Sequence, residues 1–424
     1  MIRRIFITVF FVANGSVFLS AQQTERIWEQ HPLPAVFTSN NTAITGIAFD
    51  RAGALWISVS SVSNLAGGLK YVEADSSWTI FAPENHHHPD PDNPPTEEDD
   101  DNEIACDRSL TVAVDYLDRA WFGAVGHGIS MLTDTTWRHF TTISGLLHNT
   151  VQKIITDRDT AWVATKGGVS KFVKDTCIAS YRSELADTNA TCMVLDKSGN
   201  LWVGTPKGIS VFNGAAWTNH RPIKSGTLAD NYTDVLAVDA QGNIWAAIYD
   251  AGIYKFDGTN WTLQFKKEST LFTSIVFDKK GNIWIGSDKG IWEFNGIYWE
   301  NHIENRLYND QVGDVAVDKD GAVWIACRGG LTKVYEKTTS LNVSDIKEDN
   351  PITMYPNPTR DQFTITNVSD AVISLYSVIG QEIKTYYSSR NDITIDATSF
   401  EQGTYIVKIE KNNKTSFLKL HVIR

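Results

Sequence analysis

The chain has 424 residues, of which 42% are hydrophobic, so it is long enough for two or three domains with buried cores. Its formal net charge of −12 argues against a nucleic-acid-binding protein, because contacts with phosphates need a basic face. All 14 tryptophans lie between Trp28 and Trp324, and none follows in the remainder of the chain. We therefore expect one tryptophan-rich domain followed by a domain of a different kind.

The N-terminus has the pattern of a secretory signal peptide. Arg3 and Arg4 precede a run, residues 5–13, that is apolar except for Thr8, and small residues at 19–21 offer a cleavage site. The apolar run is too short to span a bilayer. We predict a signal peptide over residues 1–21 and no transmembrane segment.

A repeat of about 40 residues fills the middle of the chain. Each unit has an apolar strand ending in Asp, a tight turn, a strand with Trp, a loop ending in Gly, a third strand and an outer strand. Four short antiparallel strands in each unit are typical of a β-propeller blade. We predict an all-β fold in which residues 22–343 form a seven-bladed β-propeller. The tryptophans that align the units are Trp56, Trp121, Trp162, Trp202, Trp245, Trp284 and Trp324.

The seventh unit lacks an outer strand, and a spare one lies near the N-terminus. Trp28-Glu-Gln-His31 matches the outer strands that begin at Trp217 and Trp299, each of which also has His three residues later. We expect this strand to complete the seventh blade and to remove an exposed sheet edge.

One interval between units is about 25 residues longer than the others, and it contains an acidic segment. Residues 84–103 have no Lys or Arg and carry several prolines, so we predict a disordered insertion over 84–107. The histidines and carboxylates of 84–103 leave weak binding of a divalent cation as an alternative. We expect no other cofactor, because the repeated Asp-containing turns offer too few oxygens for calcium.

The cysteines form no recognisable framework. Cys106, Cys177, Cys192 and Cys327 include no Cys-x-x-Cys pair. In the predicted blades Cys177 lies on an outermost strand and Cys192 on the innermost strand of the next blade, about 14 Å apart by strand spacing. A disulfide needs Cα atoms within about 7 Å, so we expect no bond between these two.

The C-terminal residues change character. After a predicted linker at 344–351, residues 352–424 contain short alternating runs rich in Ile, Val, Tyr and Thr, which predict a small β-sandwich. The segment resembles the C-terminal sorting domain of type IX secretion cargo. The resemblance implies that the secretion machinery is a partner and that the protein is secreted or displayed on the outer membrane of a Gram-negative bacterium. The matching residues are Tyr355, Pro356, Asn357, Pro358, Gly380, Gly403, Tyr405 and Lys419.

The repeats resemble a second family, the two-component-regulator propellers. Residues 196–205 and 278–287 match its Asp-x-x-Gly-x-Leu-Trp pattern best. The resemblance implies that a polar ligand such as an oligosaccharide binds to the propeller.

We expect a polar ligand, an oligosaccharide or a peptide, at the mouth of the propeller, where the loops between the second and third strands lie beside the connections between blades. No motif of a hydrolase, metalloprotease or nucleotide-binding enzyme is present, so we predict no catalytic residues. A ligand-binding module is the favoured interpretation, while a propeller hydrolase or lyase acting on polysaccharide-like substrates and a structural surface scaffold remain alternatives. The predicted ligand-binding residues in the loops are His127, Lys166, Lys207, Tyr249, Asp250, Lys289 and Arg328. The connections add His148, Asn149, Asn231, Tyr232, Tyr308 and Asn309.

Overall fold

The structure is a computed structural model, in which the chain divides into two compact units. One unit is Ile27–Tyr335, and the other consists of Met1–Arg26 with Glu336–Arg424. The structure describes residues 3–10, 18–37, 42–60, 67–82, 104, 108–223, 231–268, 270–303, 306–341, 352–377, 382–411 and 414–424.

Six sheets of the first unit each consist of four consecutive antiparallel strands. The first three sheets are β3 (Ala43–Phe49), β4 (Leu55–Ser60), β5 (Gly67–Val72) and β6 (Ser77–Phe81); β7 (Ser109–Val114), β8 (Ala120–Ala124), β9 (Ile129–Thr133) and β10 (Thr136–Phe140); and β11 (Val151–Asp157), β12 (Thr160–Thr165), β13 (Gly168–Val173) and β14 (Thr176–Tyr181). The next three are β15 (Cys192–Leu195), β16 (Leu201–Thr205), β17 (Gly208–Phe212) and β18 (Trp217–His220); β19 (Thr233–Val238), β20 (Ile244–Ile248), β21 (Gly252–Phe256) and β22 (Trp261–Phe265); and β23 (Phe272–Phe277), β24 (Ile283–Ser287), β25 (Gly290–Phe294) and β26 (Trp299–His302). Two 3-10 turns, η1 (Ala35–Phe37) and η2 (Thr142–Ser144), lie in connections.

A further sheet joins the two ends of this unit. Its order within this unit is β2 (Phe18–Pro32), β29 (Gly330–Leu341), β28 (Val323–Cys327) and β27 (Val312–Val317). In the other unit, β1 (Arg3–Phe10) pairs with the first residues of β2. The strand that carries Trp28 therefore lies outside β29, as the sequence predicts. Gln30 Nε2 also donates a hydrogen bond to the carbonyl oxygen of Leu307 at 2.9 Å.

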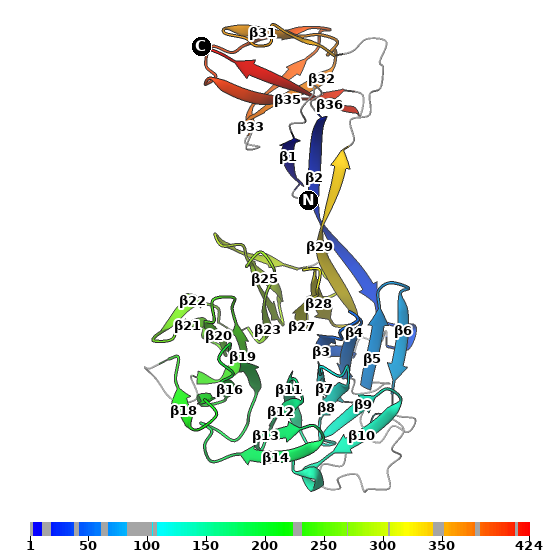
Figure 1. The fold of residues 1–424 in the computed structure, drawn as a ribbon, viewed down its shortest axis with the longest axis vertical. Coiled ribbons are helices and arrows are strands. Elements are labelled where there is room, and N and C mark those ends of the chain that lie inside the picture. The colour runs from blue at the N-terminus through cyan, green and yellow to red at the C-terminus, as the bar shows by residue number, and fades with distance from the viewer. Residues whose placement is uncertain are drawn as a thin grey trace. The chain divides into compact units, whose positions relative to one another are not determined.

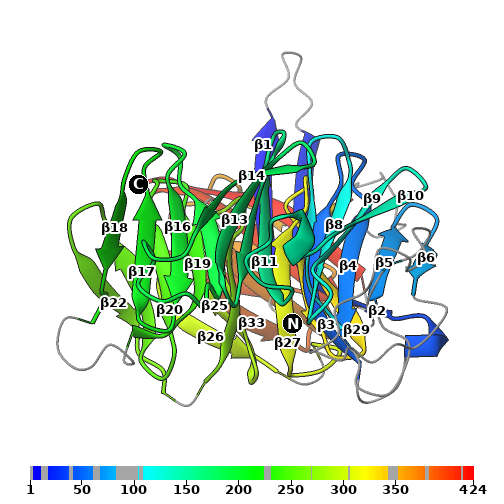
Figure 2. The same ribbon diagram turned by 90° about the horizontal axis from the view of Figure 1, so that it is seen from below.

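The first strands of successive sheets contact one another in a closed series. The series runs from β3 through β7, β11, β15, β19, β23 and β27 and back to β3. Figure 1 shows the sheets following one another around this ring, and Figure 2 shows the same sheets from the side. This arrangement is a β-propeller, so the predicted all-β fold class is confirmed. We call the sheets blades and number them from the sheet that contains β3.

The repeated Asp residues bind the repeated tryptophans. In blade five, Asp239 accepts hydrogen bonds from the indole Nε1 of Trp245 at 2.9 Å and from the backbone nitrogen of Asn243 at 2.8 Å. Asp in a tight turn commonly accepts hydrogen bonds from backbone nitrogens, whereas the indole bond emerges only with the structure. The same indole bond forms in five other blades, in the pairs Asp50–Trp56, Asp115–Trp121, Asp196–Trp202, Asp278–Trp284 and Asp318–Trp324. These carboxylates therefore hold the blade together, as expected of turn residues.

Aromatic residues on the outer strands connect neighbouring blades. The ring of His220 lies 5.3 Å from that of Trp202 in its own blade and 5.3 Å from that of Phe256 in the next. Phe81 makes the same two kinds of contact, with Trp56 and with Trp137. The aromatic residues at this repeat position therefore pack between blades, which gives them a structural role.

Three cysteines lie within the described residues. Cys177, Cys192 and Cys327 are free, so the expectation that Cys177 and Cys192 form no disulfide is confirmed. Burial raises the pKa of Cys192 to about 12, which keeps it protonated at neutral pH. Cys106 lies outside the described residues.

The predicted insertion at 84–107 and the predicted linker at 344–351 fall almost entirely outside the described residues. Within the insertion only Ile104 is described, and it is buried among residues of the first two blades, including Trp56 and Phe122. The signal peptide over residues 1–21 stays a prediction from sequence, in a region where the structure places β1 and the start of β2. In the described part of the chain, no helix is long and apolar enough to cross a membrane.

Residues of the C-terminal segment form two small sheets with one core. One sheet has the order β30 (Met354–Tyr355), β31 (Gln362–Ile365) and β34 (Ile393–Asp396); the other has the order β33 (Glu382–Ser388), β32 (Ala371–Ser377), β35 (Gly403–Lys411) and β36 (Lys414–Val422). Phe363 and Ile395 from the first sheet pack with Leu375, Val407 and Leu420 from the second. This is the predicted β-sandwich.

Candidate functional site

Backbone hydrogen bonds join the loops between second and third strands to the connections between blades. In blade five, the nitrogen of Tyr249 donates to the carbonyl oxygen of Tyr232 at 2.8 Å. Equivalent bonds occur in four more blades, from Val125 to Arg108, Lys166 to Thr150, Asp288 to Leu271 and Arg328 to Gln311. The loops and connections therefore lie together at one end of the blades, which we call the mouth face.

Several predicted ligand-binding residues are exposed on the mouth face. Lys166, Lys207, Tyr249, Asp250 and Lys289 are exposed, and Tyr249 reaches 52%. Each follows the last residue of a second strand by only a few positions, which is why the repeat register could place it. These side chains come from blades three to six.

His127 and Arg328 differ from that group. His127 is only 8% exposed, and its Nδ1 lies 3.3 Å from the carbonyl oxygen of Val125. Arg328 is half-buried and donates from Nη1 to Oε1 of Gln311 at 3.0 Å. The imidazole of His127 is thus largely buried within its loop, and the guanidinium of Arg328 is bound to the neighbouring connection.

The basic residues of blades three and four lie close to further charges. The ammonium of Lys207 forms an ion pair with Asp187 at 2.7 Å. Burial lowers the pKa of His148, and the nearby charges of Lys166 and Arg182 lower it further. His148 is therefore neutral at neutral pH, while Lys166 and Arg182 give this sector of the mouth face a positive potential.

Blade five presents two tyrosines and a partly buried acid. The rings of Tyr232 and Tyr249 lie 6.1 Å apart at an angle of 62°. Asp234, two residues after Tyr232, is half-buried near the start of β19, and burial raises its pKa to about 7. The sequence interpretation included both tyrosines but missed Asp234. A signal was available, because no other blade has an acidic residue at the equivalent repeat position.

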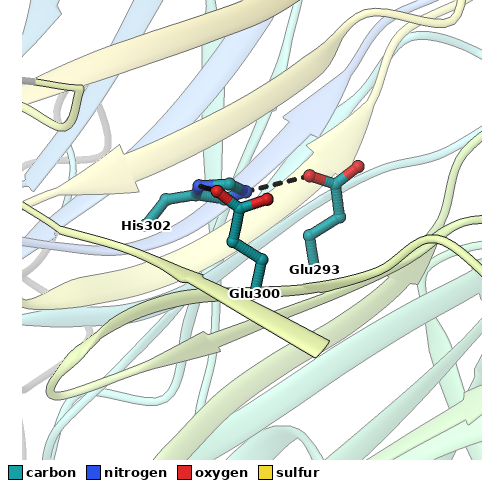
Figure 3. Close-up of side chains that lie close together, drawn as sticks. All are labelled: Glu293, Glu300 and His302. Carbon is teal, nitrogen blue, oxygen red and sulfur yellow. Dashed lines mark hydrogen bonds and ion pairs between the residues drawn. The ribbon is translucent and has the colours of Figure 1, made fainter. Parts of the chain in front are cut away.

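A cluster of metal-ligand type lies between blades six and seven. One ligand atom from each of Glu293, Glu300 and His302 lies within 4.8 Å of the others. Figure 3 shows both carboxylates approaching the imidazole. Nε2 of His302 lies 2.9 Å from Glu293, while Nδ1 lies 2.6 Å from Nη1 of Arg306.

Arg306 argues against a metal at this cluster. Its Nη1 also donates to Oε1 of Glu300 at 3.3 Å, so the guanidinium supplies the positive charge that a metal ion would bring. Glu293 lies beside Nε2 of His302, whereas Glu300 lies beside Nδ1. One cation cannot bind both nitrogens of the same ring. The ring of Trp28 on β2 lies 4.9 Å from that of His302, so the cluster packs against the closing strand.

The first four residues of the sorting motif lie beside β36, an edge strand of the sandwich. Tyr355, Pro356, Asn357 and Pro358 are exposed. The side chain of Asn357 donates to the carbonyl oxygen of Lys419 at 2.5 Å and accepts from the nitrogen of His421 at 2.8 Å. The motif is thereby fixed to the last strand, β36. Gly403 and Tyr405 lie on β35, whereas Gly380 lies outside the described residues.

Two families match parts of the sequence. Residues 353–423 match the secretion system C-terminal sorting domain, and residues 184–207 and 267–289 match the two component regulator propeller. No curated protein sequence matches the chain. Both resemblances noted from the sequence are thus confirmed for these residues.

Solved structures share the propeller fold. Two are extracellular domains of two component systems from B. thetaiotaomicron, with 17% and 14% identity and TM-scores of 0.56 and 0.57. They cover 93% and 98% of this chain, which in turn spans only 57% and 63% of theirs. A virginiamycin B lyase from Staphylococcus aureus has 13% identity, a TM-score of 0.55 and coverage of 73% of this chain and 99% of its own. At these identities the likeness establishes the fold alone.

The fold and the tail together define a class of protein. It is a propeller module that carries a type IX sorting domain, and it is secreted or located at the cell surface. The sorting domain implies that the chain interacts with the secretion machinery.

Proposed function

We propose that this exported propeller is a binding module and that its mouth face binds a polar ligand, an oligosaccharide or a peptide. The observation that carries the proposal is the mouth face, on which Lys166, Lys207, Tyr249 and Lys289 are exposed. Exposed aromatic and charged side chains on rigid, hydrogen-bonded loops suit recognition of hydroxyl, amide and charged groups. The carboxylates that repeat in every blade lie in turns at the other end of the second strands.

The test compares two variants that lose the same charge from opposite ends of the strands. The first replaces Lys166, Lys207, Lys289 and Arg328 by Ala on the mouth face. The matched control replaces Lys197, Lys279, Lys280 and Lys319 by Ala, all in turns between first and second strands. Purified protein is screened against arrays of glycans and peptides, and hits are measured by calorimetry. We expect the mouth variant to weaken binding at least tenfold and the control to bind normally.

The outcomes separate the alternatives. Equal binding by the two variants would place the ligand elsewhere and overturn the proposal. Conversion of a bound oligosaccharide into products would favour the hydrolase or lyase. A chain that binds no array member at all would favour the surface scaffold.

A further inference from the structure

Asp234 occupies a repeat position at which every other blade has an uncharged residue. In β19 the pairing with β20 skips Asp234, which therefore sits on a β-bulge. The same bulge occurs at this position in five other blades, so it belongs to the repeat, and only the type of residue distinguishes blade five. The equivalent residues of the other blades are Thr45, Leu110, Gln152, Thr191, Thr273 and Gly313.

In three other blades this position joins neighbouring blades. The hydroxyl of Thr45 donates to the carbonyl oxygen of Ser109 at 2.8 Å, and that of Thr191 donates to the carbonyl oxygen of Thr233 at 2.5 Å. Gln152 donates in the same way to the side chain of Asn189. Each bond crosses from one blade to the next, so an uncharged donor at this position stabilises the ring.

The carboxyl of Asp234 gains no such bond. Its Oδ2 is buried and has no hydrogen-bond partner among the described residues. Burying a carboxylate without partners costs free energy, and burial raises the pKa of Asp234 to about 7. An acid that weakens the ring, at a position where threonine is used three times, is the kind of local conflict expected at a functional site.

Two further departures from the repeat lie in the same blade as Asp234. Burial raises the pKa of Tyr232, and the charge of Asp234 raises it further, which places the carboxyl within electrostatic reach of that ring. The ring of Tyr249 lies 6.1 Å from the ring of Tyr232. Neither position is aromatic in any other blade. The residues equivalent to Tyr232 are Ala43, Arg108, Thr150, Asn189, Leu271 and Gln311, and those equivalent to Tyr249 are Ser60, Val125, Lys166, Pro206, Asp288 and Arg328.

We propose that Tyr232, Tyr249 and Asp234 form a subsite for a primary ammonium group carried by the ligand. Tyrosine faces attract cations, and a carboxylate adds charge and a hydrogen-bond acceptor. One carboxylate with two phenol rings does not suit a metal ion, which needs several oxygen or nitrogen ligands. A neutral group would leave the charge of Asp234 unpaired. The inference rests on the proposed function, because the subsite belongs to the same mouth face.

The probes are two matched pairs that differ in charge at nitrogen. One pair is the glucosamine hexamer and its fully N-acetylated form, and the other is a lysine-containing peptide and its acetylated form. Binding to the full-length chain is measured by calorimetry at about 100 mM sodium chloride, where contacts between distant surface charges are screened. We expect the free amine of at least one pair to bind about tenfold more tightly than its acetylated form. The pair that discriminates identifies a sugar or a peptide as the source of the ammonium group.

Three variants make the test specific. Asp234→Thr introduces the residue found at three equivalent positions, so it should fold, and it should abolish the preference for the amine. Tyr249→Ala should weaken amine binding severalfold. Asp320→Asn removes one exposed acid from a turn between first and second strands and should change nothing. Equal binding of amine and acetylated probes, or the same loss in Asp320→Asn as in Asp234→Thr, would overturn the subsite.

The subsite and the proposed function can fail separately. If the amine preference depends on Asp234 while the variant lacking four basic residues binds all probes normally, the subsite stands and the basic part of the mouth face is dispensable. If both forms of a probe bind equally and that variant loses both, the mouth face binds ligands without an ammonium subsite. If no probe binds, both proposals are overturned.

Discussion

The two ends of the second strands follow different rules. At the end where the chain turns from the first strand into the second, six blades build the same corner, in which an Asp carboxylate binds a Trp indole. At the mouth end, the residue that donates the equivalent backbone hydrogen bond differs from blade to blade. It is Val125, Lys166, Tyr249 or Arg328 in four of them. The end with the repeated corner, which we call the uniform end, stabilises the ring. The residues at the mouth end vary between blades, as expected of residues that recognise a ligand. Position in the repeat therefore separates structural residues from candidate functional ones.

The largest expected effect is loss of folding stability at low pH, because several carboxylates at the uniform end become protonated together. Burial alone would raise the pKa of Asp50, Asp196 and Asp239, but hydrogen bonds, with Trp donors foremost, hold each pKa below its ordinary value. Their contribution to stability is complete above pH about 4, the unfolded pKa, and is lost as the pH falls through the lower folded values. We expect the urea midpoint to drop steeply below pH 4. A midpoint that stays constant down to pH 2 would contradict this.

Removing one corner should have the next largest effect. Asp239→Ala leaves the indole of Trp245 and the side chain of Asn243 without their acceptor, so we expect a loss of about 3 kcal/mol in the free energy of unfolding. Urea unfolding followed by tryptophan fluorescence measures the loss. Residual folded protein should bind mouth ligands normally. A loss below about 1 kcal/mol would show that the corner is dispensable.

At the mouth end, Asp234 should change the free energy of unfolding with pH in the opposite direction. The folded pKa of Asp234, about 7, exceeds its unfolded value, so this group lowers stability as the pH rises from about 4 to 7 and leaves it low above that. Asp234→Thr should therefore raise the free energy of unfolding at pH 8 by about 2 kcal/mol and have little effect at pH 4. Denaturation at the two pH values tests this. Equal effects at both would mean that the charge of Asp234 carries no cost.

The smallest effect concerns an exposed ion pair. Lys207 and Asp187 contact each other on the mouth face, where the lysine is half exposed. Such pairs contribute little, so Lys207→Ala should change the free energy of unfolding by less than about 0.5 kcal/mol while weakening ligand binding. Calorimetry and urea unfolding of the same preparation separate the two effects. A large loss of stability would instead make Lys207 a structural residue.

Much of the fold could be predicted because it repeats. The spacing of Trp56, Trp202 and Trp284 reveals the blade, and the likeness of the segment at Trp28 to other outer strands reveals the closure. Spacing gives the path of the backbone but not the direction of each side chain. The bond from Trp245 to Asp239 therefore emerged only with the structure.

The mouth face was harder to predict in detail. The register placed Lys166 and Tyr249 correctly in exposed loops, since loop position follows from strand length. It could not show that Lys207 contacts Asp187 or that His127 turns inward, because both depend on the folding of neighbouring segments. Asp234 stands out in the sequence only by its charge, and spacing could not show that its carboxyl is buried without a partner, because burial depends on the packing of neighbouring segments.

The origin of the outer strand of blade seven has a consequence for how the chain folds. Gln30 binds Leu307, which lies 277 positions later, and Trp28 packs on His302. Contacts between such distant positions are slow to form, because a long loop must close before they contribute any stability. The other blades are each built from neighbouring strands and can form locally. Closure of the ring should therefore be the late step of folding, and double-jump refolding of Trp28→Ala would test whether it is also the slow one.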